Sequence, residues 1–353
     1  MLCPCRFGTS EATHWGWPQS RHQYCSLITS STIRVCGVPA GAGAARLDRA
    51  YDGGMAIREV RASGLEYLAL ATTLLQRLRR ADAEAGLWEA ADLQWWWRTP
   101  RRSDAIDHPF WIDDEGPVAG VLLTEWARAW GCDPVVVPDV STVALPAVWA
   151  GAVEAIDALQ LEAVEVLVRD DDSELLGLLT EAGFVGRDEP SGITWMNALD
   201  RPEVTRLPEG FVLVDRAQET TRPHPMRRRS GDEVEARLRQ CSLYNASLDL
   251  AVEAPDGDTA GYALFWFDPV TKVGLVEPMR VEDAYQRRGL ARAMLTAGLD
   301  RLAKNGARRL KVGYATDVAR ALYVGTGFRA TSTDTSYMWR RTVESAARCD
   351  ESA

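Results

Sequence analysis

A short basic segment carries the pattern that points most directly to chemistry. Gln286–Ala291 lies between a predicted strand and a predicted helix. Free backbone amides at a helix start favour anions, by about 0.3–1 kcal/mol per charge at exposed sites. Gly289 and the small Ala291 let a ligand approach the backbone, while Arg287 and Arg288 add charge suited to phosphate. The segment predicts a phosphate-binding loop, and the alternative is a helix cap with two solvated arginines.

Regular elements on both sides position this loop. Alternating residue types predict a strand near Val273–Val281, and a helix is expected from about Gly289 to Asn305. The leucines at 295, 299 and 302 share one helix face, and Asn-Gly at 305–306 ends the helix. Upstream, a hairpin is joined by a Pro-Asp-Gly turn at 255–257. The upstream strands are expected over 211–214, 248–252 and 260–267.

The chain contains two copies of one α/β pattern. In the second copy, the strand Arg309–Tyr314 is followed by a helix, Gly327-Phe328 and a strand around 335–339. In the first copy, the strand 163–168 is followed by a helix near 173–182, Gly183-Phe184 and a strand around 192–196. The two Gly-Phe pairs lie 144 residues apart. Solenoid repeats span only about 20–50 residues, so this spacing predicts a duplicated domain.

Changes in residue patterning, and residues that interrupt regular structure, divide the chain into segments. Residues 1–54 lack a sustained period, and regular patterning starts just after Met55, the expected functional start. Residues 1–54 are therefore expected to be a disordered leader or a mis-assigned start. A first domain is predicted over 55–200 and a second over 211–342, with a proline-rich linker at 201–210. A disordered tail is expected over 343–353.

The loop resembles the pyrophosphate loop of the GNAT N-acetyltransferases. Its family pattern is Gln or Arg, two residues, Gly, one residue, and then Gly or Ala. The following helix, strand, helix, Gly-Phe pair and final strand occur in that family's order, and Tyr323 precedes Phe328 as in its Tyr-x-x-x-Gly-Phe ending. The resemblance covers about Phe211–Arg340. It implies an α/β (α+β) fold of tandem GNAT-like domains, each with a mixed, mostly antiparallel sheet flanked by helices. The arrangement also looks similar to that of the mycothiol synthases, a tandem group within the family.

The resemblance implies acetyl-CoA as co-substrate and a primary amine, on a small molecule or a peptide, as acceptor. Backbone groups of Met279, Arg280 and Val281 would then bind the pantetheine arm between two splayed strands. Pro278 fits such a splay, because proline removes a ladder hydrogen bond and favours a bulge. The family often has Asn where this chain has Thr316-Asp317, which departs from its pattern. The implied pyrophosphate-binding residues are Gln286, Arg287, Arg288, Gly289, Leu290, Ala291 and Arg292.

Two residues are candidates for proton transfer. Acetylation of an amine needs a base to give the neutral amine and an acid for the leaving thiolate. Tyr323 is similar in position to the family's general acid; the alternative is a packed aromatic ring with a wet hydroxyl. Glu277 is the preferred base, directly or through water, and the alternative is a solvated strand-end carboxylate. Glu282 and Asp283 are interpreted as loop charges.

The first copy departs further from the family. Residues 134–142 contain neither glycine nor arginine, and Leu179 stands where the second copy has Tyr323. We interpret this copy as degenerate and non-catalytic. Its tryptophans suggest core and interdomain packing, with an aromatic substrate pocket as the alternative. They include Trp95, Trp96, Trp97, Trp111, Trp126 and Trp130.

Composition narrows the classes of function. The 353 residues carry a formal net charge of −10 and are 46% hydrophobic. An acidic surface disfavours nucleic acid as a partner. The chain contains no run of 18 apolar residues, so no membrane-spanning segment is predicted. The seven cysteines do not show metal-ligand spacing, so no metal is expected. Their use is typical of a reduced protein, and a cytoplasmic location is expected.

The remaining charged and titratable groups are weaker candidates for a functional site. The histidines at 108 and 224 are isolated in the sequence. The arginines at 227–229 are interpreted as a solvated run, or as an anion-binding lip. The rival to an N-acetyltransferase is a non-catalytic acyl-CoA-binding or regulatory module.

Overall fold

The computed structural model describes residues 57–138, 143–187 and 191–341. The proposed start at Met55, the leader and the tail lie outside these residues. The first half of the described chain provides four helices, α1 to α4, and seven strands, β1 to β7. The helices are α1 (Gly64–Ala81), α2 (Ala90–Trp97), α3 (Leu145–Ala158) and α4 (Ser173–Glu181). The strands are β1 (Arg58–Ala62), β2 (His108–Asp113), β3 (Gly116–Glu125), β4 (Trp130–Val136), β5 (Ala163–Arg169), β6 (Val185–Gly186) and β7 (Ser191–Asn197).

The second half repeats this pattern with helices α5 to α8 and strands β8 to β13. The predicted strands Val273–Val281 and Arg309–Tyr314 are found at those bounds, as β11 and β12. The remaining strands are β8 (Val212–Asp215), β9 (Asp249–Glu253), β10 (Thr259–Asp268) and β13 (Arg329–Arg340). The helices are α5 (Arg227–Ser230), α6 (Val234–Leu238), α7 (Leu290–Lys304) and α8 (Asp317–Val324).

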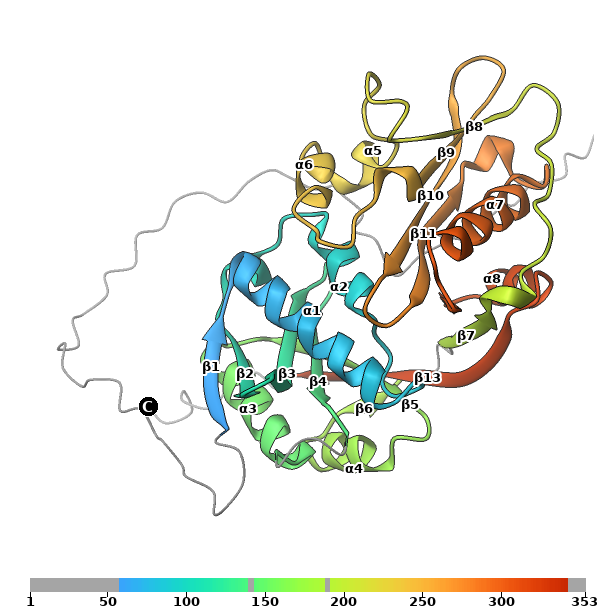
Figure 1. The fold of residues 1–353 in the computed structure, drawn as a ribbon. Helices are drawn as coiled ribbons and strands as arrows, with labels where there is room; N and C mark the ends of the chain where they lie inside the picture. Colours follow the sequence, from blue (N-terminus) through green and yellow to red (C-terminus); the bar gives the residue numbers. More distant parts are fainter. Residues whose placement is uncertain (1–56, 139–142, 188–190, 342–353) are drawn as a thin grey trace, which may run out of the picture.

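All of these strands belong to one sheet, with helices on both of its faces (Figure 1). The strand order is β1-β2-β3-β4-β5-β13-β7-β12-β11-β10-β9-β8, and β6 pairs with β13. Within the described residues, β4–β5 and β11–β12 are the parallel pairs and all other pairs are antiparallel. The predicted mixed, mostly antiparallel α/β fold is confirmed.

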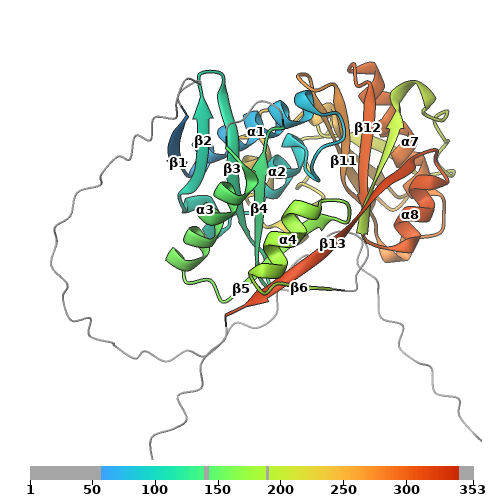
Figure 2. The ribbon, with the colours of Figure 1, turned by 90° about the horizontal axis from the view of Figure 1, so that it is seen from below.

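The two halves exchange a strand at the centre of the sheet. β7, from the first half, pairs antiparallel with β12 along its whole length, from Arg309↔Asn197 to Tyr314↔Gly192. β13, from the second half, pairs antiparallel with β5, from Asp334↔Arg169 to Arg340↔Ala163. Figure 2 shows β13 running across from the second half towards β5 and β6. Each half therefore completes the sheet of the other.

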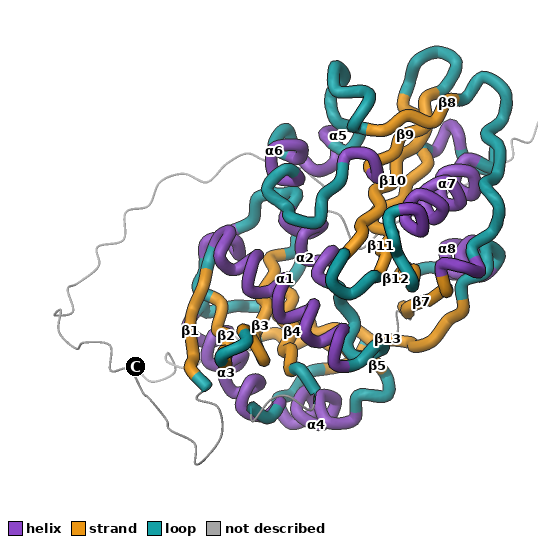
Figure 3. Tube along the Cα trace, in the orientation of Figure 1, coloured by secondary structure: helices purple, strands orange, loops and turns teal. Residues whose placement is uncertain are grey.

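Side chains from both halves also share one hydrophobic core. α1 and α2 cover one face of the sheet, and α2 lies where the halves meet, against β10 and β11 (Figure 3). The cluster beneath them joins Leu74 and Trp95 of the first half to Leu264 and Trp266 of the second. Burial of apolar area contributes roughly 25 cal/mol per Å², so the contact between the halves contributes to the stability of both.

Helix α7 packs closely on the opposite face of the second half. Leu295, Leu299 and Leu302 are fully buried, which confirms the predicted apolar face. A Cβ added to Gly298 would lie 2.0 Å from the ring of Phe265 in β10. Glycine at this position therefore allows the close approach of α7, whose N-terminus follows the candidate phosphate loop.

Candidate active site

The strands β11 and β12 separate where the candidate site begins. They pair in parallel at Val273, Gly274 and Leu275 only, although β11 continues to Val281. On its other side, β11 pairs with β10 through a register shift between Ala263 and Phe265. The bulge expected near Pro278 is therefore present. Met279–Val281 therefore have no partner in β12, and we call the region where the two strands are no longer paired the wedge.

The loop after β11 presents a row of free amides. A turn of 3₁₀-helix at Asp283–Tyr285 leads into it, and α7 begins at Leu290. Gly289 has φ 82° and Arg287 has φ 61°, which turn successive amides towards one side. Among the described residues, no group accepts a hydrogen bond from the amides of 287–292. Such a nest of amides at a helix N-terminus is suited to a phosphate.

The charges around this loop agree with its shape. Arg287, Arg288 and Arg292 are exposed, and none of them forms an ion pair within the described residues. A Cβ added to Gly289 would meet nothing within 4 Å, so the space beside it is open. These guanidinium groups leave an excess of positive charge next to the free amides, as binding of a diphosphate requires.

Glu282, which precedes the loop, forms an ion pair with Arg229. Arg229 forms a bidentate pair with Glu282, at 2.6 and 2.8 Å, and the side chain of Arg280 lies 3.5 Å from the same carboxylate. Burial alone would raise the pKa of Glu282, but these guanidinium groups hold it below its usual value. Glu282 is therefore a paired structural carboxylate. The interpretation of 227–229 as a solvated run is wrong for Arg229.

Tyr323 lies on α8, with its ring buried and its hydroxyl free. The ring is 6% exposed and contacts Phe328 edge to face, with the centroids 6.1 Å apart. The hydroxyl forms no hydrogen bond with any described residue. Burial, and next the charge of Glu277, raise its pKa. Thr316 is the N-cap of helix α8, and its hydroxyl accepts a hydrogen bond from Ala319 N, so this departure from the family pattern has a structural role.

Glu277 lies on β11, two residues beyond the last pair with β12. The pKa of its carboxyl is raised to about 7. Burial is the largest cause and the charge of Asp92 adds to it, while Arg98 and a hydrogen bond from Trp95 act in the opposite direction. A carboxylate that titrates near 7 is well suited to act as a general base at neutral pH. The charge of Glu277 contributes to the raised pKa of Tyr323, so the two candidates for proton transfer lie in the same region of the fold.

The groups that surround Glu277 come from the first half of the chain. Asp92 and Trp95 both belong to α2, and Arg98 follows it directly. Burial raises the pKa of Asp92 to about 6. Sequence reasoning interpreted the tryptophans at 95–97 as core and interdomain packing, and all three are buried in the shared core. It did not identify α2 as a neighbour of Glu277, because no local pattern links residues 92–98 to residue 277.

A small cavity lies beside Glu277 at the junction of the halves. Its volume is about 30 Å³, which is room for a water molecule. Asp92, Glu277 and Lys311 line it. Lys311 is 2% exposed and bonds Glu89 of the first half at 2.9 Å. The cavity could hold a water that relays a proton to Glu277.

The weaker candidates have structural roles in this fold. His224 is 4% exposed and bonds Asp249 at 2.8 Å, and His108 is fully buried and stacks on Tyr67. Leu179, at the position that matches Tyr323, is fully buried in the core of the first half. Within the described residues, no group of three or more His, Cys, Asp or Glu is arranged to hold a metal ion. The helices of the described segments include none that is long and apolar enough to span a bilayer.

Comparisons with known proteins agree with this geometry. The model of the acetyltransferase (GNAT) family matches residues 214–328, about a third of the chain. A GCN5-related N-acetyltransferase from Sphaerobacter thermophilus superposes with a TM-score of 0.54 at 16% identity, covering 81% of this chain and 97% of its own. A tandem GNAT protein from the clavulanic acid biosynthesis pathway, solved without AcCoA, gives 0.58 at 16% identity, covering 80% and 98%. No curated protein matches the chain in sequence. At these identities the solved structures establish the fold, that of a tandem GNAT protein.

Proposed function

We propose, from the membership of residues 214–328 in the acetyltransferase (GNAT) family, that this chain transfers an acetyl group from acetyl-CoA to a primary amine. The family supports acyl transfer in general, and the nature of the acyl group and of the acceptor are parts of the proposal. One observation supports it most: beyond Leu275 the wedge leads to a loop whose amides at 287–292 donate to no described residue, beside three exposed arginines that form no ion pair with any described residue.

The residues present fit the coenzyme that the family uses. The amides of 287–292 and the arginines beside them would hold the pyrophosphate. The free backbone of Met279, Arg280 and Val281 would bond the amides of the pantetheine arm, much as a neighbouring strand would. The thioester would then lie deep in the wedge, near Glu277 and Tyr323. Bound acetyl-CoA supplies the activated acyl group, and the chain supplies position and proton transfer.

The proton steps follow from the two titrating groups. Glu277 takes a proton from the acceptor ammonium, directly or through a water molecule, for which the adjacent cavity has room. The neutral amine nitrogen then bonds to the carbonyl carbon of the thioester, and the carbon–sulfur bond breaks. Tyr323 donates its hydroxyl proton to the departing sulfur and regains a proton that the amine nitrogen loses. The products are an amide and free coenzyme A.

The rival function is a module that binds acyl-CoA without turnover. Glu277 and Tyr323 argue against it, since neither is needed to hold the coenzyme. Glu277 is the more telling of the two, because its partial burial beside Asp92 destabilises its charged form. A protein that only binds gains nothing from such a carboxylate, whereas a base with a pKa near 7 is of use to an enzyme.

A thiol-release assay tests the proposal. The protein is incubated with acetyl-CoA and a panel of primary amines, and free thiol is followed over time. Thiol release that depends on one amine, with the acetylated amine detected by mass spectrometry, is the expected result. If acetyl-CoA raises the melting temperature but no amine in a broad panel accelerates thiol release, the non-catalytic function is the correct one.

A further inference from the structure

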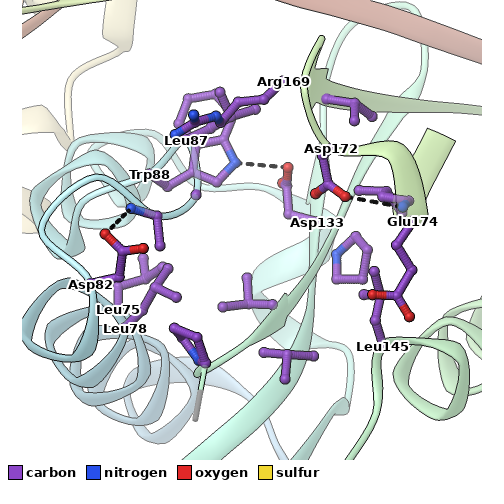
Figure 4. A pocket seen from close by; sticks show the side chains of 18 of the residues that line it. Leu75, Leu78, Asp82, Leu87, Trp88, Asp133, Leu145, Arg169, Asp172 and Glu174 are labelled. Atoms are coloured by element: carbon purple, nitrogen blue, oxygen red, sulfur yellow. Dashed lines mark hydrogen bonds between the residues drawn. The ribbon is translucent and has the colours of Figure 1, made fainter. Parts of the chain in front are cut away.

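The first half contains a large cavity of its own. Its volume is about 900 Å³, and it lies between the α1–α2 connection, β4, β5 and the start of α4. Figure 4 shows Leu75, Leu78 and Asp82 on one side of it and Leu145, Asp172 and Glu174 on the other. The volume is within the range of pockets that bind small organic molecules, about 300–1,000 Å³. Apolar side chains supply much of its wall, including Val135, Val136, Leu167 and Leu175.

This cavity is the first-half counterpart of the coenzyme wedge. The parallel pair β4–β5 ends at Gly131↔Glu165, as β11–β12 ends at Leu275↔Lys311. Asp133 lies two residues beyond Gly131 and Glu277 two residues beyond Leu275, and a proline follows each of them. These positions are 144 residues apart, the same spacing that separates the two Gly-Phe pairs. Asp133 is therefore the copy of Glu277 in the duplicated domain.

The charge of the cavity lining is opposite to that of a coenzyme site. Arg169 is its one cationic residue among the described residues, and Asp171 neutralises it through two hydrogen bonds of 2.8 and 2.7 Å. Asp82 and Asp172 accept hydrogen bonds from backbone amides of their own loops, and Glu174 is exposed without an ion pair among the described residues. The remaining carboxylates lining the cavity are those of Glu84 and Asp133. Phosphates would be repelled by such a lining, and an ammonium group would be attracted.

We propose that this cavity binds an organic cation, a primary amine with an apolar body, with Asp133 as its inner anionic partner and the acidic rim around it. The apolar wall accommodates the body of the ligand. The Asp133 carboxylate accepts a hydrogen bond from Trp88 Nε1 at 2.8 Å and is 9% exposed, so its position is fixed. The cavity shares Leu87, Trp88 and Leu167 with the small cavity beside Glu277. The proposal does not depend on the catalytic activity proposed above.

The titration of Asp133 sets the conditions for binding. Burial raises the pKa of its carboxyl to about 7; the hydrogen bond from Trp88 lowers it, and the charges of Glu165 on β5 and Asp92 on α2 raise it. A cation gains most from Asp133 when this carboxyl is ionised. Binding is therefore best measured at pH 8.5, where Asp133 is ionised and a primary amine is still protonated.

Three probes of one shape test the proposal by calorimetry on the full chain without coenzyme. They are phenethylamine, 2-phenylethanol and 3-phenylpropionate, which present a cation, a neutral group and an anion. We expect phenethylamine to bind, the alcohol to bind at least tenfold more weakly and the anion not to bind. Asp133→Asn keeps a hydrogen-bond acceptor for Trp88 and removes the negative charge. The variant should bind phenethylamine about tenfold more weakly or worse, because hydrogen bonds to charged groups are stronger than those to neutral groups.

Two control measurements separate this site from the catalytic one. Glu277→Gln makes the equivalent change in the second half and should leave the affinity for phenethylamine unchanged. Saturating coenzyme A should also leave it unchanged. Glu174→Lys, at the exposed rim, should weaken binding several-fold without affecting folding, so it tests the site even if Asp133→Asn fails to fold.

Several outcomes would overturn the proposal. Equal binding of all three probes would remove the role of charge, and an absence of phenethylamine binding at millimolar concentration would remove the site. If Glu277→Gln weakened phenethylamine and Asp133→Asn did not, the amine would bind only beside the catalytic base. Competition by coenzyme A would make the cavity a second coenzyme cleft. A failure of the chain to bind acetyl-CoA would disprove the proposed function and leave these results untouched.

Discussion

The Tyr323 hydroxyl donates to no described residue and lies near the Glu277 carboxylate, so its role can be tested by removing one oxygen atom. Tyr323→Phe keeps the buried ring and its edge contact with Phe328. We expect turnover to fall on the order of 10²-fold, the contribution of one positioned acid, with little change in the Kd for acetyl-CoA. Steady-state kinetics and calorimetry on the same preparation measure both. Turnover at the wild-type rate would mean that solvent or another group protonates the sulfur.

Glu277 should impose a pH dependence on the reaction. Because the pKa of its carboxyl is raised to about 7, the base is increasingly protonated below that pH. The wild-type rate should therefore fall about tenfold per pH unit well below pH 7. Glu277→Gln should be much slower at high pH and should lack this acidic limb. A wild-type limb that persisted in Glu277→Gln would assign the titration to another group.

The same titration should be measurable in stability. The folded pKa of Glu277 lies above the ordinary value of 4.5, so the folded state holds this proton more tightly than the unfolded state. The free energy of unfolding contributed by Glu277 is then largest below about pH 4.5 and is lost as pH rises towards 7. The Glu277→Gln variant has no titrating carboxyl at this position, so its free energy of unfolding does not change with pH through this group. The melting temperature of the variant, relative to wild type, should rise between pH 5 and pH 8, and a constant difference would contradict the shift.

At the scale of elements, the strand–loop–helix unit β11–α7 should determine coenzyme binding. Gly289→Glu places a negative side chain in the open space beside the free amides, and it should abolish the thermal shift given by acetyl-CoA. Gly289→Ala is the matched control, because both variants bear the cost of a Cβ at φ 82°, about 1 kcal/mol. Gly289→Ala should still show the thermal shift with acetyl-CoA, because only the carboxylate of Gly289→Glu is expected to prevent binding. A normal shift in Gly289→Glu would place the coenzyme elsewhere.

Local patterns account for the elements that the sequence predicted well. Alternation defined β11 and β12, and the glycine, arginines and small residue of 286–291 indicated the loop, because each depends on neighbours within a few residues. The Asp133-Pro134 and Glu277-Pro278 correspondence is visible in the sequence, at the same 144-residue spacing as the Gly-Phe pairs. No site was predicted from it, because the first copy lacks the phosphate loop that marks the site in the second.

Long-range pairing could not be predicted in the same way. Both copies end in similar strands, so the residue pattern does not reveal whether β7 pairs beside β5 or beside β12. The placement of α2 over Glu277 follows from that choice and from the shared core. The polar cluster of Arg79, Glu89 and Lys311, which joins the halves, was not predicted either. Lys311 lies 222 positions from Glu89 and becomes its neighbour only in the folded sheet.

At the scale of the whole molecule, the first half contributes structure to the second. It supplies β7 to the central sheet, α2 to the surroundings of Glu277, and Glu89 as the partner of the buried Lys311. A single hydrophobic cluster extends through both halves. The chain should therefore unfold in one cooperative transition. Two calorimetric transitions would show that the halves are independent units.

The exchanged strands give the sharpest test of this architecture. If the chain is divided in the linker, after Glu203, the fragment 1–203 retains β7 but lacks β13 beside β5, and the fragment 204–353 retains β13 but lacks β7 beside β12. Each fragment alone would expose unpaired strand edges and the apolar surface of the shared core, and we expect it to be insoluble or unfolded. Expressed together, the two should form a 1:1 complex that binds acetyl-CoA with an affinity close to that of the intact chain. Size-exclusion chromatography with light scattering and a thermal-shift assay measure both properties. A fragment 204–353 that is monomeric, folded and able to bind acetyl-CoA by itself would show that β7 and α2 are dispensable, and that the first half is an accessory domain.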